Sequence, residues 1–342
     1  MSAQLAHVPT ASAQPQRAAV APSPRASLTA QRCSRRVTLE PTYGGGRCGV
    51  EVSYLWCGAP DAPTVVVQGG ISASRDVIAA DGAAQPGWWQ ALVGEGKAID
   101  LNQYRVLSID WLSPAELGGA TAISSADQAN AISALIDALG IGRIAAFVGS
   151  SYGAMVALAF AKAHPWQLDR LVLLAGAHRA HPISTALRSV QRGIVRLGQS
   201  SGQLDEALSL ARQLAMTTYR GSEEFARRFS AAPEFREDRF HFPVEDYLDQ
   251  AGRRFVARFD AERFLALSES IDLHDVQPES VPTPATLIGF PSDRLVPLAD
   301  LCELQRRLAG PATLEVVESP YGHDGFLKET DRLAPLLRQA LL

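Results

Sequence analysis

The stretch IAAFVGSSYGAMVALAFAKA, residues 144–163, decides the fold of this chain. It starts with an apolar run typical of a buried strand, passes through Gly-Ser-Ser-Tyr-Gly at 149–153, and continues as an apolar helical stretch. A G-x-S-x-G motif between a strand and a helix is typical of a sharp turn that holds a serine hydroxyl at the helix N-terminus. The register selects Ser151 as the candidate nucleophile. A Gly/Ser-rich turn without a catalytic role can have the same sequence. The assignment of Ser151 as nucleophile therefore depends on finding a base and a carboxylate elsewhere in the chain.

Two candidate partners follow the serine. Asp293 comes in a loop after the strand-like run 285–288. His323 lies in Tyr-Gly-His-Asp, after the run 313–317. A serine hydroxyl is a weak nucleophile, so it needs an imidazole to accept its proton and a carboxylate to orient that imidazole. Because loops at the carboxyl ends of parallel strands meet at one edge of a sheet, we expect Ser151, Asp293 and His323 to form a catalytic triad. The chain order Ser, Asp, His is that of the α/β-hydrolase fold.

Such a site also needs two backbone N–H groups that hold the negative oxygen of the transition state. One is the amide after the nucleophile, here Tyr152, and the other comes from a loop after an earlier strand. The pair Gly69-Gly70 follows the strand-like run 64–67 and permits close approach of the backbone to a ligand. This places the second amide of the expected oxyanion hole at Ile71. A glycine turn with no ligand is the alternative.

Strand-like and helical stretches alternate from residue 64 onward. The apolar runs expected to be strands are 64–67, 105–109, 144–148, 171–174, 285–288 and 313–317. One helix is expected to start at Ser125, with Gln128 as its capping-box partner, and to end at Gly140. Fully apolar strands that alternate with helices indicate a mostly parallel sheet flanked by helices. We therefore predict an α/β-hydrolase fold.

Three segments of different character divide the chain. Residues 188–273 lose the strand signal and interleave charged with apolar residues at helical spacing, which predicts a helical cap inserted into the core. The core then comprises residues 40–187 and 274–342. Residues 1–39 contain no Asp or Glu and are rich in Ala, Pro, Ser and Arg, so we expect a disordered N-terminal tail. A transit peptide is the alternative for this tail, but its prolines interrupt an amphipathic helix.

Charge and composition narrow the range of functions. The 342 residues carry 32 basic and 36 acidic side chains, whereas proteins that bind nucleic acid or anionic membranes normally have a basic excess. A membrane span needs about 18 consecutive apolar residues, and no run in this sequence is that long. No secretory signal is recognisable either, so we expect a cytoplasmic protein. The four cysteines have no metal-ligand spacing, and no metal is expected. A small molecule is the expected partner.

Several further blocks carry a family resemblance. They are Gly-Trp-Trp at 87–89, Gly-Glu-Gly-Lys-Ala-Ile-Asp at 94–100, the cap segments 211–213, 218–220, 244–248, 258–260 and 267–272, and the run 322–327. Together they resemble the homoserine O-acyltransferases of the MetX type. The resemblance covers residues 69–342 and is more specific than the serine motif, because several separated blocks agree.

This resemblance implies transfer of an acyl group from acyl-CoA to the hydroxyl of L-homoserine, in methionine biosynthesis, by a homodimer without metal or cofactor. Ser151 would carry the acyl group in a ping-pong mechanism, with Asp293 and His323 as its partners. Arg212 and Asp324 would bind the substrate. Their chemistry fits, because an amino acid offers a carboxylate to a guanidinium and an ammonium to a carboxylate.

The acyl donor and the acceptor have alternatives. Residues 149–155 and the short loop 110–114 depart from the common family pattern, which affects the expected acyl pocket. Residues 186–192 resemble the branches that use succinyl-CoA, so succinyl is the predicted acyl group. Acetyl-CoA as donor, serine as acceptor, and hydrolysis of esters or lactones by the same triad are the alternatives.

Overall fold

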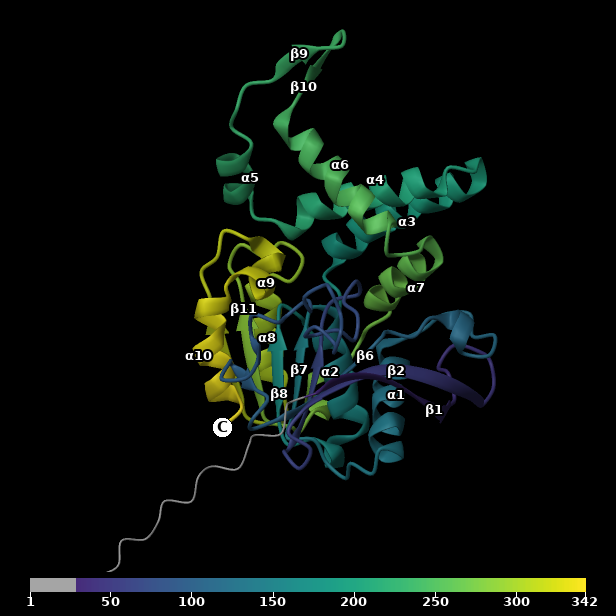
Figure 1. Ribbon diagram of the computed structural model, residues 1–342, viewed down its shortest axis with the longest axis vertical. Coiled ribbons are helices and arrows are strands. Elements are labelled where there is room, and N and C mark those ends of the chain that lie inside the picture. Colours follow the sequence, from purple (N-terminus) through teal and green to yellow (C-terminus); the bar gives the residue numbers. More distant parts are fainter. Residues whose placement is uncertain (1–28) are drawn as a thin grey trace, which may run out of the picture.

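The computed structural model describes residues 29–342, and an eight-stranded sheet forms its centre (Figure 1). In sheet order the strands are β1 (Ala30–Leu39), β2 (Cys48–Gly58), β6 (Arg105–Ile109), β3 (Thr64–Gln68), β7 (Ala146–Ser150), β8 (Leu171–Leu174), β11 (Ala285–Gly289) and β12 (Ala312–Val316). β2 runs antiparallel to both neighbours, and the other pairs are parallel. The predicted mostly parallel sheet is confirmed.

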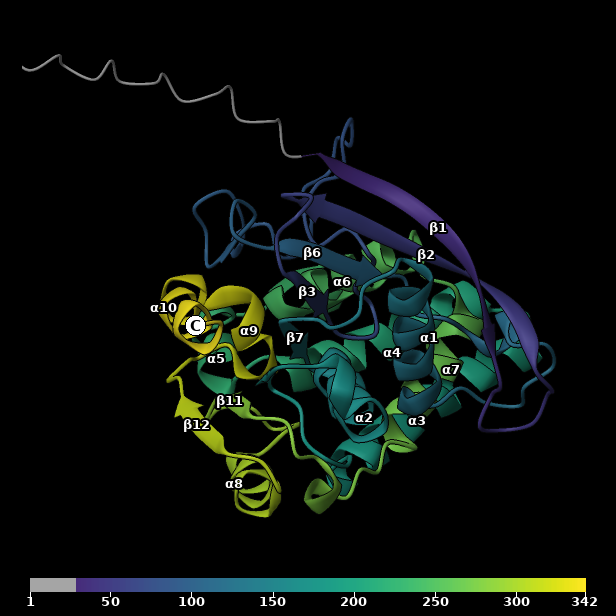
Figure 2. The same cartoon turned by 90° about the horizontal axis from the view of Figure 1, so that it is seen from below.

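Helices cover both faces of this sheet (Figure 2). The helices of the core are α1 (Ser125–Ala138), α2 (Tyr152–Ala163), α8 (Leu298–Arg307), α9 (Gly325–Lys328) and α10 (Thr330–Ala340), with 3-10 turns at Pro114–Glu116, Pro165–Gln167, Pro278–Ser280 and Gly322–Asp324. α1, α2 and α8 share one hydrophobic core with side chains such as Val66, whereas α10 shares the other with Val65. Successive strand residues point to opposite faces, so both faces of these apolar strands are buried. A small parallel pair, β4 (Val93–Gly94) and β5 (Ile99–Asp100), belongs to the α10 side.

A helical cap lies over the carboxyl ends of the parallel strands (Figure 1). It consists of α3 (Pro182–Ser201), α4 (Leu204–Tyr219), α5 (Ser222–Arg228), α6 (Pro243–Val256) and α7 (Ala261–Asp272). α4 packs against α3, α6 and α7, around buried side chains that include Val195, Leu208 and Phe255. The predicted cap boundary at residue 188 falls inside α3. That helix begins at Pro182, where the fixed φ of proline suits the first helical position.

The cap also contains a short hairpin, where the sequence indicated helices alone. β9 (Glu234–Arg236) and β10 (Arg239–His241) pair antiparallel across Glu237 and Asp238, which both have positive φ. Two central residues with positive φ give a turn whose twist matches that of the strands. Strands of three residues are too short to show a period-2 pattern.

The predicted tail of residues 1–39 was wrong for its last ten residues. Residues 30–39 form β1, paired with β2 from Ala30 opposite Cys57 to Leu39 opposite Cys48. Its arginines are exposed, as is common on an edge strand, while Val37 is buried. A prediction from amino-acid composition does not detect such a strand, because backbone hydrogen bonds to β2 provide much of its order. Residues 1–28 lie outside the described part of the chain. None of the helices within residues 29–342 is long and apolar enough to cross a bilayer.

Candidate active site

The serine motif forms a strained turn between β7 and α2. Ser151 has φ 55° and ψ −119°, a conformation that costs a non-glycine residue free energy and is typical of functional sites. A Cβ at Gly149 would lie 2.3 Å from the carbonyl oxygen of Gly153, and one at Gly153 would lie 2.3 Å from that of Gln68. Both glycines of the motif are therefore required by close backbone contacts. The turn raises Ser151 at the start of α2.

The structure brings the three predicted triad residues together. Oγ of Ser151 lies 2.8 Å from Nε2 of His323, and Nδ1 of His323 lies 2.7 Å from Oδ2 of Asp293. The other oxygen, Oδ1 of Asp293, accepts the backbone N–H groups of Leu295 (2.8 Å) and Val296 (3.0 Å). These two bonds fix the carboxylate. The carboxylate accepts a hydrogen bond from Nδ1–H of His323, so the Nε2 lone pair remains available to the proton of the serine hydroxyl.

Two opposing effects act on the buried imidazole. Burial lowers the pKa of His323, because it disfavours the charged ring. The charge and hydrogen bond of Asp293, together with the charge of Asp324, raise the pKa, and the net result lies above the ordinary 6.5. The site therefore stabilises an imidazolium, the species that forms when His323 takes the proton of Ser151.

The predicted oxyanion amides border the same serine. Tyr152 is the first residue of α2, where backbone N–H groups have no partner within the helix. The loop before Ile71 is anchored by two bonds: the N–H of Gly153 donates to the carbonyl of Gly69 (2.9 Å), and the Trp111 indole donates to that of Gly70 (3.0 Å). Ile71 and Tyr152 line the cavity in front of Ser151. The structure therefore brings both residues to the candidate nucleophile, and the oxyanion role of their amides stays a prediction.

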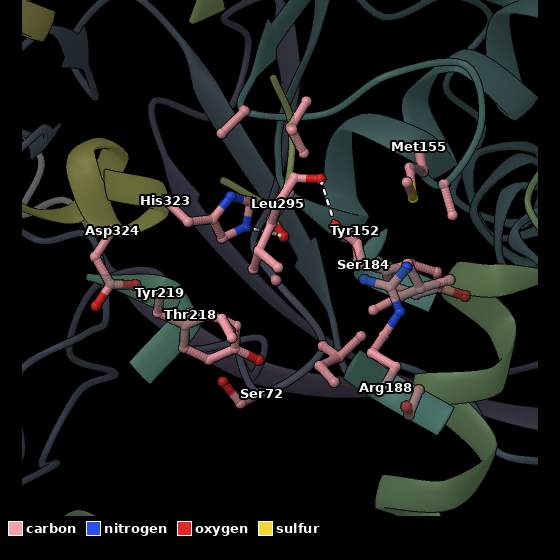
Figure 3. A pocket seen from close by; sticks show the side chains of 18 of the residues that line it. Ser72, Tyr152, Met155, Ser184, Arg188, Thr218, Tyr219, Leu295, His323 and Asp324 are labelled. Carbon is pink, nitrogen blue, oxygen red and sulfur yellow. Dashed lines mark hydrogen bonds between the residues drawn. The ribbon is translucent and has the colours of Figure 1, made fainter. Parts of the chain in front are cut away.

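Ser151 and His323 open into a cavity of about 270 Å³ between the sheet and the cap. Most of its wall is apolar, and a few charged side chains interrupt it. Figure 3 shows His323 and Asp324 on one side of this cavity and Arg188 and Met155 on the other. A ligand that reaches Ser151 is therefore enclosed by both the core and the cap.

The two predicted substrate-binding residues both line this cavity, but they are not paired with each other. Asp324 forms an ion pair with Arg220, with Nε 3.0 Å from Oδ2. Burial raises the pKa of Asp324 above its ordinary value, although the charges of Arg220, His323 and Arg212 act against this. The guanidinium of Arg212 lies 5.1 Å from the ring centre of Tyr219, close enough for a cation–π contact. Arg212 is thus held at the cavity wall.

No group of three or more His, Cys, Asp or Glu side chains suited to a metal ion occurs in residues 29–342. The chemistry available in the described site is that of a nucleophilic serine with its base, its orienting carboxylate and backbone donors.

Comparison with known proteins assigns the family. Residues 63–330 match the α/β-hydrolase fold family. A homoserine O-succinyltransferase of Xanthomonas campestris pv. campestris is 47% identical over 301 residues, which cover 88% of this chain and 81% of that protein. The chain belongs to the homoserine O-acyltransferase family. It is accordingly an acyltransferase with an α/β-hydrolase fold, and the resemblance seen in the sequence is confirmed.

Other members of the homoserine O-acyltransferase family and its structural relatives extend this picture. A serine O-succinyltransferase of Stenotrophomonas maltophilia is 33% identical, and the alignment covers 86% of this chain and 92% of that protein. The crystal structure of a homoserine O-acetyltransferase from Bacillus anthracis superposes with a TM-score of 0.80 over 91% of this chain and 97% of its own. At 19% identity, that likeness concerns the fold alone.

Sequence reasoning missed three side chains of this acyltransferase site. Arg220 binds Asp324, the Tyr219 ring lies 5.9 Å from the His323 ring between centres, and Arg188 lines the cavity. All three belong to segments that carried the family resemblance, 218–220 and 186–192. The resemblance located the segments. Only the packing of the cap on the core shows which of their side chains face the cavity.

Proposed function

We propose that this protein is a homoserine O-succinyltransferase, which moves the succinyl group of succinyl-CoA to the side-chain hydroxyl of L-homoserine in methionine biosynthesis. One observation carries the proposal: Arg212 and Asp324 line the same cavity as Ser151. Opposite charges beside a nucleophile suit an acceptor that is itself an amino acid. The 47% identical relative named homoserine O-succinyltransferase supports the choice of acyl group.

The first half-reaction transfers the acyl group to the enzyme. Nε2 of His323 takes the proton of Ser151 as Oγ attacks the thioester carbonyl carbon. The N–H groups of Tyr152 and Ile71 stabilise the resulting oxyanion. When the carbon–sulfur bond breaks, the sulfur takes the proton from His323 and CoA leaves. Asp293 orients the imidazole throughout and stabilises its charged form.

The second half-reaction transfers the acyl group to homoserine. Arg212 would hold the carboxylate of homoserine, and Asp324 its ammonium. The homoserine hydroxyl gives its proton to His323 and attacks the ester carbonyl carbon. The bond to Ser151 then breaks, and Oγ recovers the proton from His323. The cap limits hydrolysis of the acyl-enzyme by excluding water from the cavity.

The family resemblance also supports expectations about the oligomeric state, compartment, donor and cofactors of the working enzyme. We propose that it acts as a homodimer in the cytoplasm, with acyl-CoA as a substrate and without a metal or organic cofactor. Sedimentation of the purified protein measures the first expectation. Activity after dialysis against a chelator measures the need for metal.

The decisive experiment supplies the purified protein with succinyl-CoA or acetyl-CoA, and with homoserine, serine or water as acceptor. We expect O-succinylhomoserine as the main product, identified by mass spectrometry, and none with Ser151→Ala. O-acetylhomoserine or O-succinylserine as the main product would assign a different donor or acceptor. Free succinate at the same rate with and without homoserine would show a hydrolase instead.

A further inference from the structure

A charged cluster reaches the cavity wall through Arg188, across from Asp324 (Figure 3). In α3, Arg188 donates through Nε (2.8 Å) and Nη2 (2.6 Å) to Oδ1 of Asp272, the last residue of α7. Arg192, one turn further along α3, donates through Nη1 to Oδ2 of Asp272 at 2.6 Å. All three side chains are largely shielded from solvent, with exposed fractions of 12%, 9% and 9% for Arg188, Arg192 and Asp272. Two guanidinium groups therefore share one carboxylate.

This arrangement leaves one positive charge in surplus. Arg192 has further bonds to the carbonyl and hydroxyl of Ser268, both at 3.1 Å, so its charge is surrounded by protein acceptors. Arg188 uses Nε and Nη2 on one oxygen of Asp272, and within residues 29–342 its Nη1 group makes no hydrogen bond. Because Arg188 borders the cavity, its unused Nη1 group can donate to a bound anion, which would neutralise the surplus charge. The cluster is therefore suited to a further carboxylate.

Of the three cluster residues, Arg188 is the one that borders the cavity of Ser151 and His323. Arg188 lines the cavity together with Ser184 and Gln191, which lie on the same side of α3, whereas Arg192 is not part of the cavity wall. Figure 3 shows Arg188 on the side opposite Asp324. The charge of Arg188 also acts on His323, whose pKa it lowers against the larger effect of Asp293. An acyl group on Ser151 can thus extend toward Arg188 without crossing the acceptor side.

We propose that Arg188 determines acyl specificity by binding the terminal carboxylate of a dicarboxylic acyl group through Nη1, with Asp272 and Arg192 holding its guanidinium in place. This inference rests on the proposed function, and it names the residue that distinguishes one acyl chain from another. Met155, Leu187 and Val296 add apolar surface to the cavity, which suits the methylene groups of the acyl chain, whereas a shorter neutral acyl group leaves Arg188 without an anion.

The test compares three donors that differ in chain length and charge. Succinyl-CoA and butyryl-CoA both carry four-carbon acyl chains, but only succinyl has the carboxylate, and acetyl-CoA is short and neutral. We expect Arg188→Met to lower kcat/KM for succinyl-CoA about 10- to 100-fold, as for a lost hydrogen bond between charged groups. The values for butyryl-CoA and acetyl-CoA should stay within about threefold or rise. Arg188→Lys keeps the charge but not the planar donor group, so its succinyl-to-butyryl ratio should lie between those of the wild type and Arg188→Met.

A matched control separates this role from a general effect of positive charge. Arg258 also lines the cavity but is exposed, so Arg258→Met removes the same charge at the rim. It should leave the succinyl-to-butyryl ratio unchanged. An unchanged ratio in both Arg188→Met and Arg188→Lys would overturn the inference, and so would an equal fall in Arg258→Met. Failure of the wild type to acylate homoserine from any donor would instead reject the proposed function.

Discussion

Nε of Arg220 lies 3.0 Å from Oδ2 of Asp324, so the residue that follows the base of the triad is held by the cap. Arg220 stands at the end of α4 and also pairs with Glu224 of α5 at 3.2 Å. The Tyr219 ring lies beside that of His323. The loop that carries His323 and Asp324, the proposed base and the proposed acceptor-binding carboxylate, is therefore supported from the cap as well as from the sheet.

Asp324→Asn should weaken the use of homoserine while sparing formation of the acyl-enzyme. The amide removes the negative charge proposed to bind the substrate ammonium, at a loss of roughly 1.5 to 3 kcal/mol for a charged hydrogen bond. Arg212→Lys should have a similar effect through the substrate carboxylate, since lysine does not reproduce a bidentate contact. Two quantities are measured for each variant: the dependence of the transfer rate on homoserine concentration, and the burst of CoA that is released when the acyl-enzyme forms. Unchanged homoserine kinetics in both variants would contradict the assigned roles.

The pH dependence of acylation should reflect the raised pKa of His323. The first half-reaction needs a neutral imidazole, so kcat/KM for the acyl donor should rise with pH through a value above 6.5 and then level off. The charge of Asp324 contributes to raising that pKa, and Asp324→Asn should shift the rise to lower pH. A pH profile of donor kcat/KM for both proteins gives the answer. A shift to higher pH in the variant would reverse the expected sign.

Ser151→Ala should abolish transfer, with a loss on the order of 10⁶ in rate, as for the nucleophile of a triad. Removing one hydroxyl from this turn takes away little packing, so the melting temperature should change little. Ser150→Ala is the matched control, because Oγ of Ser150 is buried without a hydrogen-bond partner in the described residues. If Ser150→Ala were the inactive variant, the register of the motif would be wrong.

Acyl-CoA alone should label the protein, because the two-step mechanism leaves an ester on Ser151 until an acceptor arrives. Intact-mass spectrometry should show one succinyl increment, which disappears when homoserine is added. Double-reciprocal plots at several homoserine concentrations should be parallel. Intersecting lines without a covalent species would instead indicate direct transfer between the two bound substrates.

The serine turn at 149–153 and the loops at the strand ends were predictable from sequence because each depends on a local pattern. The glycines at 149 and 153 meet backbone atoms of neighbouring segments, so the motif is a steric requirement. The first strands were not predictable in the same way, since β1 is polar along most of its length and gains its order from pairing with β2. The N-cap of α1 was misplaced by one residue. Ser124 and Asp127 form the capping box, because Ser124 has extended backbone and Ser125 is already helical.

The ion pairs around the cavity were harder to predict. Arg188, Arg220 and Asp272 lie far apart in the sequence, on three different helices or their ends, and each on its own is an ordinary helix residue. Their pairing depends on how α3, α4 and α7 pack against one another and against the loop at Asp324. No local pattern encodes such tertiary contacts, although the family-like segments marked where they occur.

Gly221→Ala should damage the site through packing alone. Gly221 links α4 to α5, and a Cβ there would lie 2.2 Å from the carbonyl oxygen of Pro320, in the loop that leads to His323. Backbone atoms of both segments must move apart to admit a methyl group, and overpacking of this kind costs about 1 to 3 kcal/mol. We expect a lower midpoint of urea unfolding and a fall in kcat/KM for both substrates, because the base and Asp324 shift together.

Gly193→Ala is the matched control for this change. Gly193 is an exposed position within α3, and a Cβ there would meet no atom within 4 Å. Alanine is favoured over glycine in a helix by about 1 kcal/mol, so this variant should be as active as the wild type and slightly more stable. Gly221→Ala with wild-type activity and stability would show that the cap does not support the His323 loop. A loss of stability with unchanged kcat/KM would confine the contact to a structural role.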